Sequence, residues 1–147
     1  MNRREIIRVM ITVAAAVPLA ACSAGKQAAG RQGLKMASLS DLPTEVQNGP
    51  VALREGYQFA LANPDVLKQI PCYCGCGGVG HTSNYSCYIK DDTGGQIVFD
   101  QHAEGCSICV DITQDTMRLL AQGRSVAEIK AEVDKTYSQY GPTNMEY

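Results

Sequence analysis

The sequence predicts a mainly α-helical domain of the α+β class, with one small β-hairpin and a C-terminal helical hairpin packed on a cysteine-rich loop region. Apolar residues recur at helical spacing between residues 51 and 62 and again between about 107 and 140, which predicts helices in both stretches. Two short β-rich runs around a turn at 91–95 predict the hairpin. Residues 71–81, PCYCGCGGVGH, are rich in cysteine and glycine and have neither periodicity, which is typical of a loop.

The first 21 residues have the pattern of a cleaved export signal. Three arginines within the first eight residues precede an apolar run from residue 9 to 21, which is too short to span a membrane. The run ends in Leu19-Ala20-Ala21-Cys22, which resembles the lipobox of bacterial lipoproteins. That resemblance implies cleavage before Cys22, lipidation of Cys22, and attachment by acyl chains to the extracytoplasmic face of the cell membrane.

The basic start also bears on the export route. The run Arg3-Arg4-Glu5-Ile6-Ile7-Arg8 resembles a twin-arginine export signal. That route carries folded proteins, so the thiols could leave the cytoplasm already holding metal. Export through the Sec route is the alternative, and it would deliver an unfolded chain to oxidising conditions that favour disulfides.

Residues 22–50 are predicted to form a flexible spacer behind the lipidated cysteine. They are rich in Ala, Gly, Ser, Gln and Lys and have little apolar periodicity. The folded domain is expected over residues 51–142, followed by a short tail at 143–147. The chain has 13 basic and 15 acidic side chains and no basic stripe, which argues against a nucleic-acid partner.

The domain should begin with a helix over residues 51–62. Asn63-Pro64-Asp65 then has the pattern of a new helix start, with Asn63 as the N-cap and Pro64 in the first helical position. This short second helix, at 66–70, leads the chain into Pro71 and the thiol loop.

The hairpin is expected to pair Ser86–Lys90 with Gln96–Asp100. With Lys90 opposite Gln96, Cys87 would face Phe99 and lie close to His102.

Two helices should close the domain as a hairpin. The first runs from about Ser107 or Asp111 to Gln122 and ends at Gly123. The second starts at a capping box formed by Ser125 and Glu128. Its apolar face consists of Val126, Ile129, Val133, Tyr137 and Tyr140, and Met117 on the first helix is expected to be a core residue and not a copper ligand.

The six cysteines and two histidines of the domain form the most informative pattern, C-x-C-x-C-x4-H-x5-C-x14-H-x3-C-x2-C. Thiolates two or three residues apart suit a soft or borderline ion, and Cu(I) or Zn(II) fit best. The helix start is expected to lower the pKa of the Cys106 and Cys109 thiols. The candidate metal ligands are Cys72, Cys74, Cys76, Cys87, Cys106, Cys109, His81 and His102.

Two other interpretations use the same thiols. One is an extracytoplasmic thiol-disulfide oxidoreductase, in which Cys106 and Cys109 act as the redox pair together with the CYCGC thiols. The other is a structural domain stabilised by disulfide bonds, although a disulfide between the two cysteines of C-x-C would close a very small ring. No Ser-His-Asp or paired-carboxylate pattern stands out, so no catalytic residue is predicted under the metal-binding interpretation. That interpretation also predicts a partner protein that delivers or receives the ion.

The pattern resembles a known family. PCYCGC followed by a histidine, a lone cysteine before a hairpin, and H-x3-C-x2-C together resemble the PCYCGC-motif (CYCXC) family of bacterial lipoproteins, from about Tyr57 to Tyr140. The resemblance implies an exported, membrane-anchored protein with thiols at the six positions above. The C-terminal stretch also resembles the helical hairpin of the thiol proteins of cytochrome c maturation, which carry a redox C-x-x-C just before it.

Overall fold

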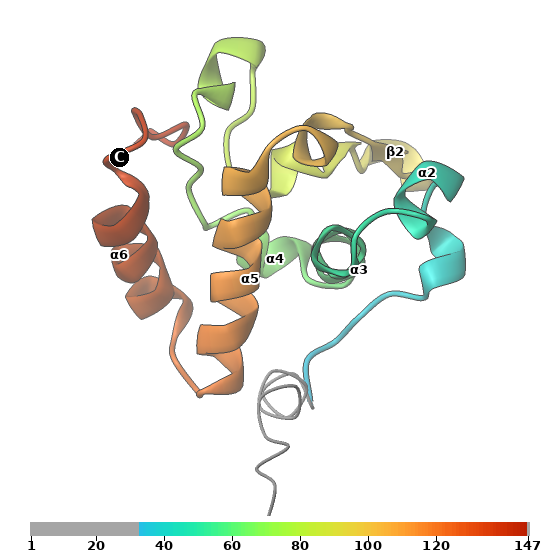
Figure 1. Ribbon diagram of the computed structural model, residues 1–147, viewed down its shortest axis with the longest axis horizontal. Coiled ribbons are helices and arrows are strands. Elements are labelled where there is room, and N and C mark those ends of the chain that lie inside the picture. Colours follow the sequence, from blue (N-terminus) through green and yellow to red (C-terminus); the bar gives the residue numbers. More distant parts are fainter. Residues whose placement is uncertain (1–32, 147) are drawn as a thin grey trace, which may run out of the picture.

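The fold is described from a computed structural model, in which residues 33–146 are placed (Figure 1). The predicted export signal at 1–21 and the predicted lipidation site Cys22 lie outside the described residues. None of the helices within residues 33–146 combines the length and the apolar character needed to cross a bilayer.

The described chain is mainly helical with one small antiparallel sheet, as the sequence predicts. Its α-helices are α2 (Thr44–Gln47), α3 (Val51–Ala62), α4 (Pro64–Leu67), α5 (Ser107–Ala121) and α6 (Val126–Tyr137). Its two strands are β1 (Ile89–Asp91) and β2 (Val98–Phe99), and several short 3-10 turns lie between these elements.

Helix α5 is the centre of the domain, because it packs against both α6 and α3 (Figure 1). Its buried face includes Ile112 and Met117, and Met117 is fully buried, which confirms it as a core residue. From α3, Tyr57 and Phe59 enter the same core. Four of the cysteines, Cys72, Cys76, Cys87 and Cys109, belong to this core.

The turn between α5 and α6 agrees with the sequence prediction. Gly123 takes a left-handed φ of 80° just after α5, and the Ser125–Glu128 capping box is formed at the start of α6. Of the predicted apolar face, Tyr140 does not belong to the core, since it lies beyond the end of α6 and is 58% exposed.

The hairpin register differs from the predicted one by two residues. Ile89, and not Cys87, lies opposite Phe99. The connecting loop is longer than expected, because Gly94 and Gly95 both take left-handed φ values (75° and 79°) and Ile97 stays outside the strand. Cys87 therefore falls in a 3-10 turn before β1 instead of within a strand.

The packed domain begins earlier than residue 51. Leu42 and Val46, four residues apart, are both buried, and Ala37 exchanges hydrogen bonds with Gln58 of α3 (3.0 Å from Ala37 N, 2.8 Å from Gln58 Nε2). The described part of the predicted spacer, residues 33–50, therefore contributes buried residues to the domain and is hydrogen-bonded to α3.

The start of α4 also differs in detail from the prediction. Pro64 does occupy the first turn, but the helix spans Pro64–Leu67 and not 66–70. The amide of Asn63 makes no cap there, because it donates to the carbonyl oxygens of Phe59 and Lys35, both at 2.9 Å. Asn63 therefore ties the end of α3 to the segment that precedes it.

Candidate metal centre

The thiol loop enters the site from the end of α4. Cys72 and Cys76 are buried, whereas Cys74 between them is partly exposed. Gly75 takes a left-handed φ of 82°, which non-glycine residues adopt only with strain. This reversal of the chain lets Cys74 and Cys76 join different groups of donors.

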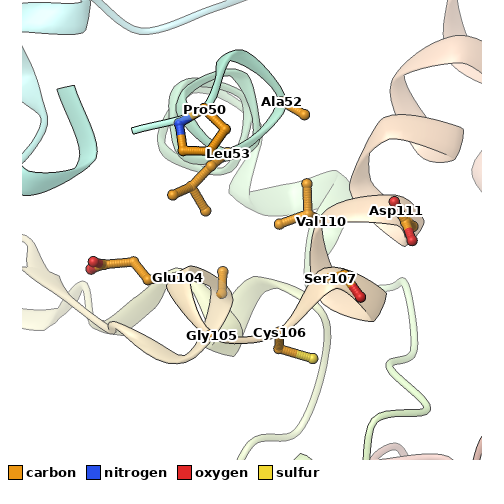
Figure 2. A pocket seen from close by; sticks show the side chains of 10 residues that line it. Pro50, Ala52, Leu53, Glu104, Gly105, Cys106, Ser107, Val110 and Asp111 are labelled. Carbon is orange, nitrogen blue, oxygen red and sulfur yellow. The ribbon is translucent and has the colours of Figure 1, made fainter. Parts of the chain in front are cut away.

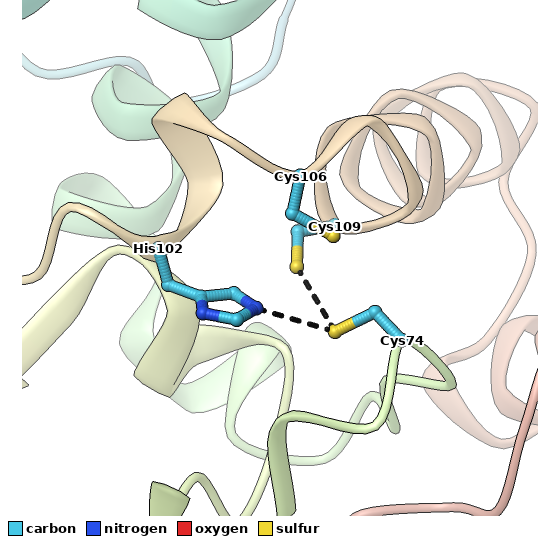
Figure 3. Close-up of side chains that lie close together, drawn as sticks. All are labelled: Cys74, His102, Cys106 and Cys109. Carbon is cyan, nitrogen blue, oxygen red and sulfur yellow. Dashed lines mark hydrogen bonds between the residues drawn. The ribbon is translucent and has the colours of Figure 1, made fainter.

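The first group combines the loop with the start of α5. Cys74, His102, Cys106 and Cys109 each place one donor atom within 4.8 Å of the other three (Figure 3). Cys74 Sγ lies 3.4 Å from His102 Nε2 and 3.6 Å from Cys109 Sγ. Cys106 caps α5 and Cys109 lies one turn into it, so both thiols face the loop from one helix end.

The second group is made of sulfur alone. Cys72, Cys76 and Cys87 place their Sγ atoms within 4.8 Å of one another, with 3.8 Å between Cys76 and Cys87. Its members come from the thiol loop and from the 3-10 turn before β1.

Cys72 also touches the first group. Its Sγ lies 3.4 Å from Cys74 Sγ and 3.6 Å from Cys109 Sγ. In a tetrahedral site with metal–sulfur bonds of about 2.3 Å, neighbouring sulfur atoms lie about 3.8 Å apart. The observed separations are therefore close to those that a bound ion imposes on its ligands.

The two histidines stand together at the edge of the thiols. Their ring centroids are 4.9 Å apart, and His81, His102 and Cys76 form a third, overlapping group of donors. Asp100 contacts both, with Oδ2 lying 3.5 Å from His81 Nε2 and Oδ1 accepting from the His102 backbone N–H at 2.8 Å. His81 Nδ1 is buried and has no hydrogen-bond partner among the described residues. A carboxylate on one ring nitrogen is the usual way to orient a ligating histidine, which leaves Nδ1 for a metal.

A buried polar network fixes Cys109. Its carbonyl oxygen accepts from Asn84 Nδ2 at 3.1 Å and from the Tyr88 hydroxyl at 3.0 Å. The Thr113 hydroxyl donates to Asn84 Oδ1 at 2.6 Å and lies 2.7 Å from the Tyr88 hydroxyl. All three side chains are fully buried, so their hydrogen bonds specify one position for this part of α5.

The segment predicted as a tail reaches the thiol loop. Asn144 Oδ1 accepts from Cys72 N at 2.7 Å, and Asn144 N donates to Cys72 O at 3.1 Å. Its Nδ2 also donates to Cys76 Sγ at 3.4 Å. Neither Asn144 nor Asp100 belongs to a motif, and no signal in the sequence marks either of them.

All eight predicted ligands therefore fall into three overlapping groups, although Cys87 and His102 do not share one. A family model described as "Protein of unknown function with PCYCGC motif" matches residues 11–145, which is most of the chain. The chain belongs to this PCYCGC family. Neither the search of curated proteins nor the search of solved structures finds a match.

The acidity of the thiols in this PCYCGC domain is set by their contacts with one another. Hydrogen bonding from Cys109 lowers the pKa of Cys72 to about 4, and hydrogen bonds from Cys109 and Cys72 hold the pKa of Cys74 far below its usual range. The pKa of Cys109 is raised, first by its hydrogen bond to Cys72, and burial raises the pKa of Cys106. The predicted lowering of the pKa values of Cys106 and Cys109 by the helix start is therefore wrong in direction, because burial raises the first and contact with Cys72 raises the second.

The remaining two thiols of the PCYCGC domain stay protonated more readily. The pKa of Cys76 is raised mainly by hydrogen bonding with Cys72, and that of Cys87 mainly by hydrogen bonding with Cys109. All six cysteines of the described chain are free thiols. Clustered donors of this kind could hold a metal ion.

A groove of about 420 Å³ runs along the outer side of this centre (Figure 2). Leu53 of α3 and Val110 of α5 lie across the groove from each other, and Glu104 and Asp111 supply acidic groups. Cys106 lines the same groove, so one member of the first donor group borders a surface depression.

Proposed function

We propose that this PCYCGC protein is a metal-handling lipoprotein that binds Cu(I) or Zn(II) through its clustered cysteines. The observation that carries the proposal is the first group of donors, three thiols and one imidazole from three separate chain segments within 4.8 Å of one another. Three sulfurs and one nitrogen are a usual ligand set for a four-coordinate soft or borderline ion. Deprotonation of a ligating thiol releases its proton to solvent on binding.

The surrounding residues support a built site. Asn84 and Tyr88 hold Cys109 from the protein side, Asn144 holds the loop, and Asp100 contacts both histidines. Such outer partners orient ligands and raise metal affinity.

Membrane attachment through Cys22 and a location on the extracytoplasmic face complete the proposal. Cys22 and much of the apolar run before it lie within the residues that the family model matches. The lipobox-like sequence at 19–22 remains the argument for lipidation.

A partner protein would deliver or receive the ion at the exposed side of the site. Cys74, His102 and Cys106 are partly exposed, whereas Cys109 is buried, so ligand exchange would begin with the first three. The groove beside Cys106 provides a surface where such a partner could make contact.

Thiol-disulfide exchange is the second candidate function, and one observation favours it. Cys74 is partly exposed, has a lowered pKa and lies 3.6 Å from Cys109, so a small movement would join the two sulfurs. This places the more reactive thiol in the loop, whereas the sequence pointed to the Cys106–Cys109 pair.

The decisive experiment measures bound metal and free thiols together on protein purified without chelator. We expect bound Cu or Zn with reduced thiols, and loss of metal in both Cys74→Ser and Cys106→Ser. Ser107→Ala, next to Cys106 but outside every donor group, is the matched control and should keep its metal. A reduced protein that binds neither ion more tightly than micromolar, with one thiol pair that titrates at a defined potential, would make the oxidoreductase the correct assignment.

A further inference from the structure

The number of donors exceeds what one ion can use. Six thiols and His102 lie in two connected groups, one of four donors and one of three. Zn(II) in a protein site takes four ligands, so one ion in the first group would leave three sulfurs unused. Those three, Cys72, Cys76 and Cys87, are already close enough to share a second ion.

Burial determines which ion the second group suits. Cys72 and Cys87 are 0% exposed and Cys76 is 2% exposed. A water molecule therefore has no open route to complete a four-coordinate shell around an ion held there. His81 does not supply the fourth ligand, because its donor group contains Cys76 and His102 but neither Cys72 nor Cys87. Zn(II) would therefore remain one ligand short, whereas Cu(I) is a soft ion that is satisfied by three thiolate sulfurs.

Cys72 lies where the two groups meet. Its sulfur is 3.4 Å from Cys74 Sγ and 3.6 Å from Cys109 Sγ, while it also belongs to the second group. A thiolate has lone pairs for two metals, so this sulfur can be shared. A shared sulfur also lowers the number of negative charges that must be buried together.

The second group also has its own outer support. Asn144 Nδ2 donates to Cys76 Sγ, and Asn144 is joined to the backbone of Cys72 by two further hydrogen bonds. A donor aimed at a ligating sulfur stabilises its thiolate form.

We propose that Cys72, Cys76 and Cys87 form a second, buried site that is selective for Cu(I), with Cys72 as the sulfur shared between two ions. This inference rests on the proposed metal-binding function and adds a stoichiometry to it. The protein takes up two Cu(I) ions per chain but only one Zn(II) ion. Each newly ligated thiol gives its proton to solvent, and no ion changes its oxidation state.

The test is an anaerobic titration of the fully reduced protein with Cu(I) and, separately, with Zn(II), read by native mass spectrometry. The expected counts are two Cu(I) and one Zn(II). One Cu(I) per chain would overturn the second site and leave the proposed function standing, and no binding of either ion would overturn both. Two Zn(II) ions per chain would overturn the selectivity for Cu(I).

A double variant locates the second ion. Cys76→Ser combined with Cys87→Ser should reduce Cu(I) from two to one and leave the single Zn(II) unchanged, which also shows that the variant is folded. Two Cu(I) in this variant would overturn the assignment.

A measurement on the unaltered protein avoids any folding defect. X-ray absorption of the Cu(I)-loaded protein should show sulfur-dominated ligation and a copper–copper scattering path, since the ions share Cys72. Two bound coppers without that path would exclude the shared sulfur.

Discussion

Asn144 and the backbone of Cys72 are joined by two hydrogen bonds: the Asn144 side-chain Oδ1 accepts from Cys72 N at 2.7 Å, and the Asn144 backbone N donates to Cys72 O at 3.1 Å. The glycine-rich loop around the cysteines has little rigidity of its own, so this contact is what fixes its entry. One side chain outside the cysteine pattern therefore determines where the first thiol of the loop lies.

Asn144→Ala should destabilise the reduced, metal-free protein by about 1–3 kcal/mol, because it leaves the buried N–H of Cys72 unpaired. Chemical denaturation with chelator present measures the change. Gln139→Ala is the control, since the exposed Gln139 side chain donates to the nearby Thr136 carbonyl and makes no contact with the thiol loop among residues 33–146. Equal stability of the two variants would show that the loop is held by other contacts.

Gly56→Ala should also destabilise the protein, although alanine is the better helix former by about 1 kcal/mol. A Cβ at position 56 would lie 3.0 Å from Tyr88 Cε1 and 3.1 Å from its hydroxyl oxygen. The ring, fully buried, would have to move, and such overpacking costs about 1–3 kcal/mol. Denaturation midpoints measure the effect.

The matched control for this change is Gly78→Ala, where a Cβ meets nothing within 4 Å and φ is not positive. If Gly56→Ala matches this control, α3 and Tyr88 have room to separate. Gly56→Ala should also weaken the proposed metal binding, because the Tyr88 hydroxyl holds the Cys109 carbonyl.

Glu128 gives a pH-dependent prediction. The backbone N–H of Ser125 lowers the pKa of Glu128 below its ordinary 4.5. A carboxyl with a lowered folded-state pKa contributes stability above its unfolded pKa and loses that contribution as the pH falls. Glu128→Gln should therefore be less stable than the parent at pH 7, and the difference should shrink below the ordinary pKa of 4.5.

Thermal melts from pH 7 to pH 3 in the metal-free state test this expectation. Glu132→Gln on the same helix is the comparison, since it lies outside the capping box. If the difference in melting temperature between Glu128→Gln and the parent does not become smaller at acidic pH, the charge of Glu128 does not contribute to the cap.

Cys22→Ser should release the protein from membranes without changing its fold. Lipidation requires the thiol, and the apolar run before it is too short to span a bilayer. Fractionation of cells followed by immunoblotting measures the distribution. Membrane association that persists in the variant would contradict lipid anchoring. The control is Gln139→Ala, an exposed position outside both the donor groups and the predicted signal, which should stay on the membrane.

The sequence predicts the helices well because their limits depend on local signals. Gly123 and the Ser125–Glu128 box mark the turn between α5 and α6, and α3 occupies the predicted residues. The register of the β-hairpin could not be predicted from local signals. It depends on the conformation of the loop at Gly94 and Gly95, and the sequence does not determine the length of that loop.

The site residues also fall into those that the sequence predicts and those that it does not. The clustered cysteines could be predicted, because thiols two or three residues apart lie close together whatever the tertiary structure. Asp100 and Asn144 act only through the fold, and an isolated aspartate or asparagine has no distinguishing spacing. Tyr88 likewise resembles any core aromatic residue until its hydroxyl is seen on the Cys109 carbonyl.

The network around Cys109 has a kinetic consequence. Neutral buried groups hold the backbone carbonyl of this residue, so the position of its backbone in α5 does not depend on contacts with the glycine loop. For an ion held as proposed, the ligands on the loop would dissociate first, while the ligands on α5 remain bound to the ion. Rebinding of the loop ligands would then compete with release of the ion. The dissociation rate would then follow the frequency of loop opening, and it could be tuned at the loop without altering the helix that keeps the ion in place.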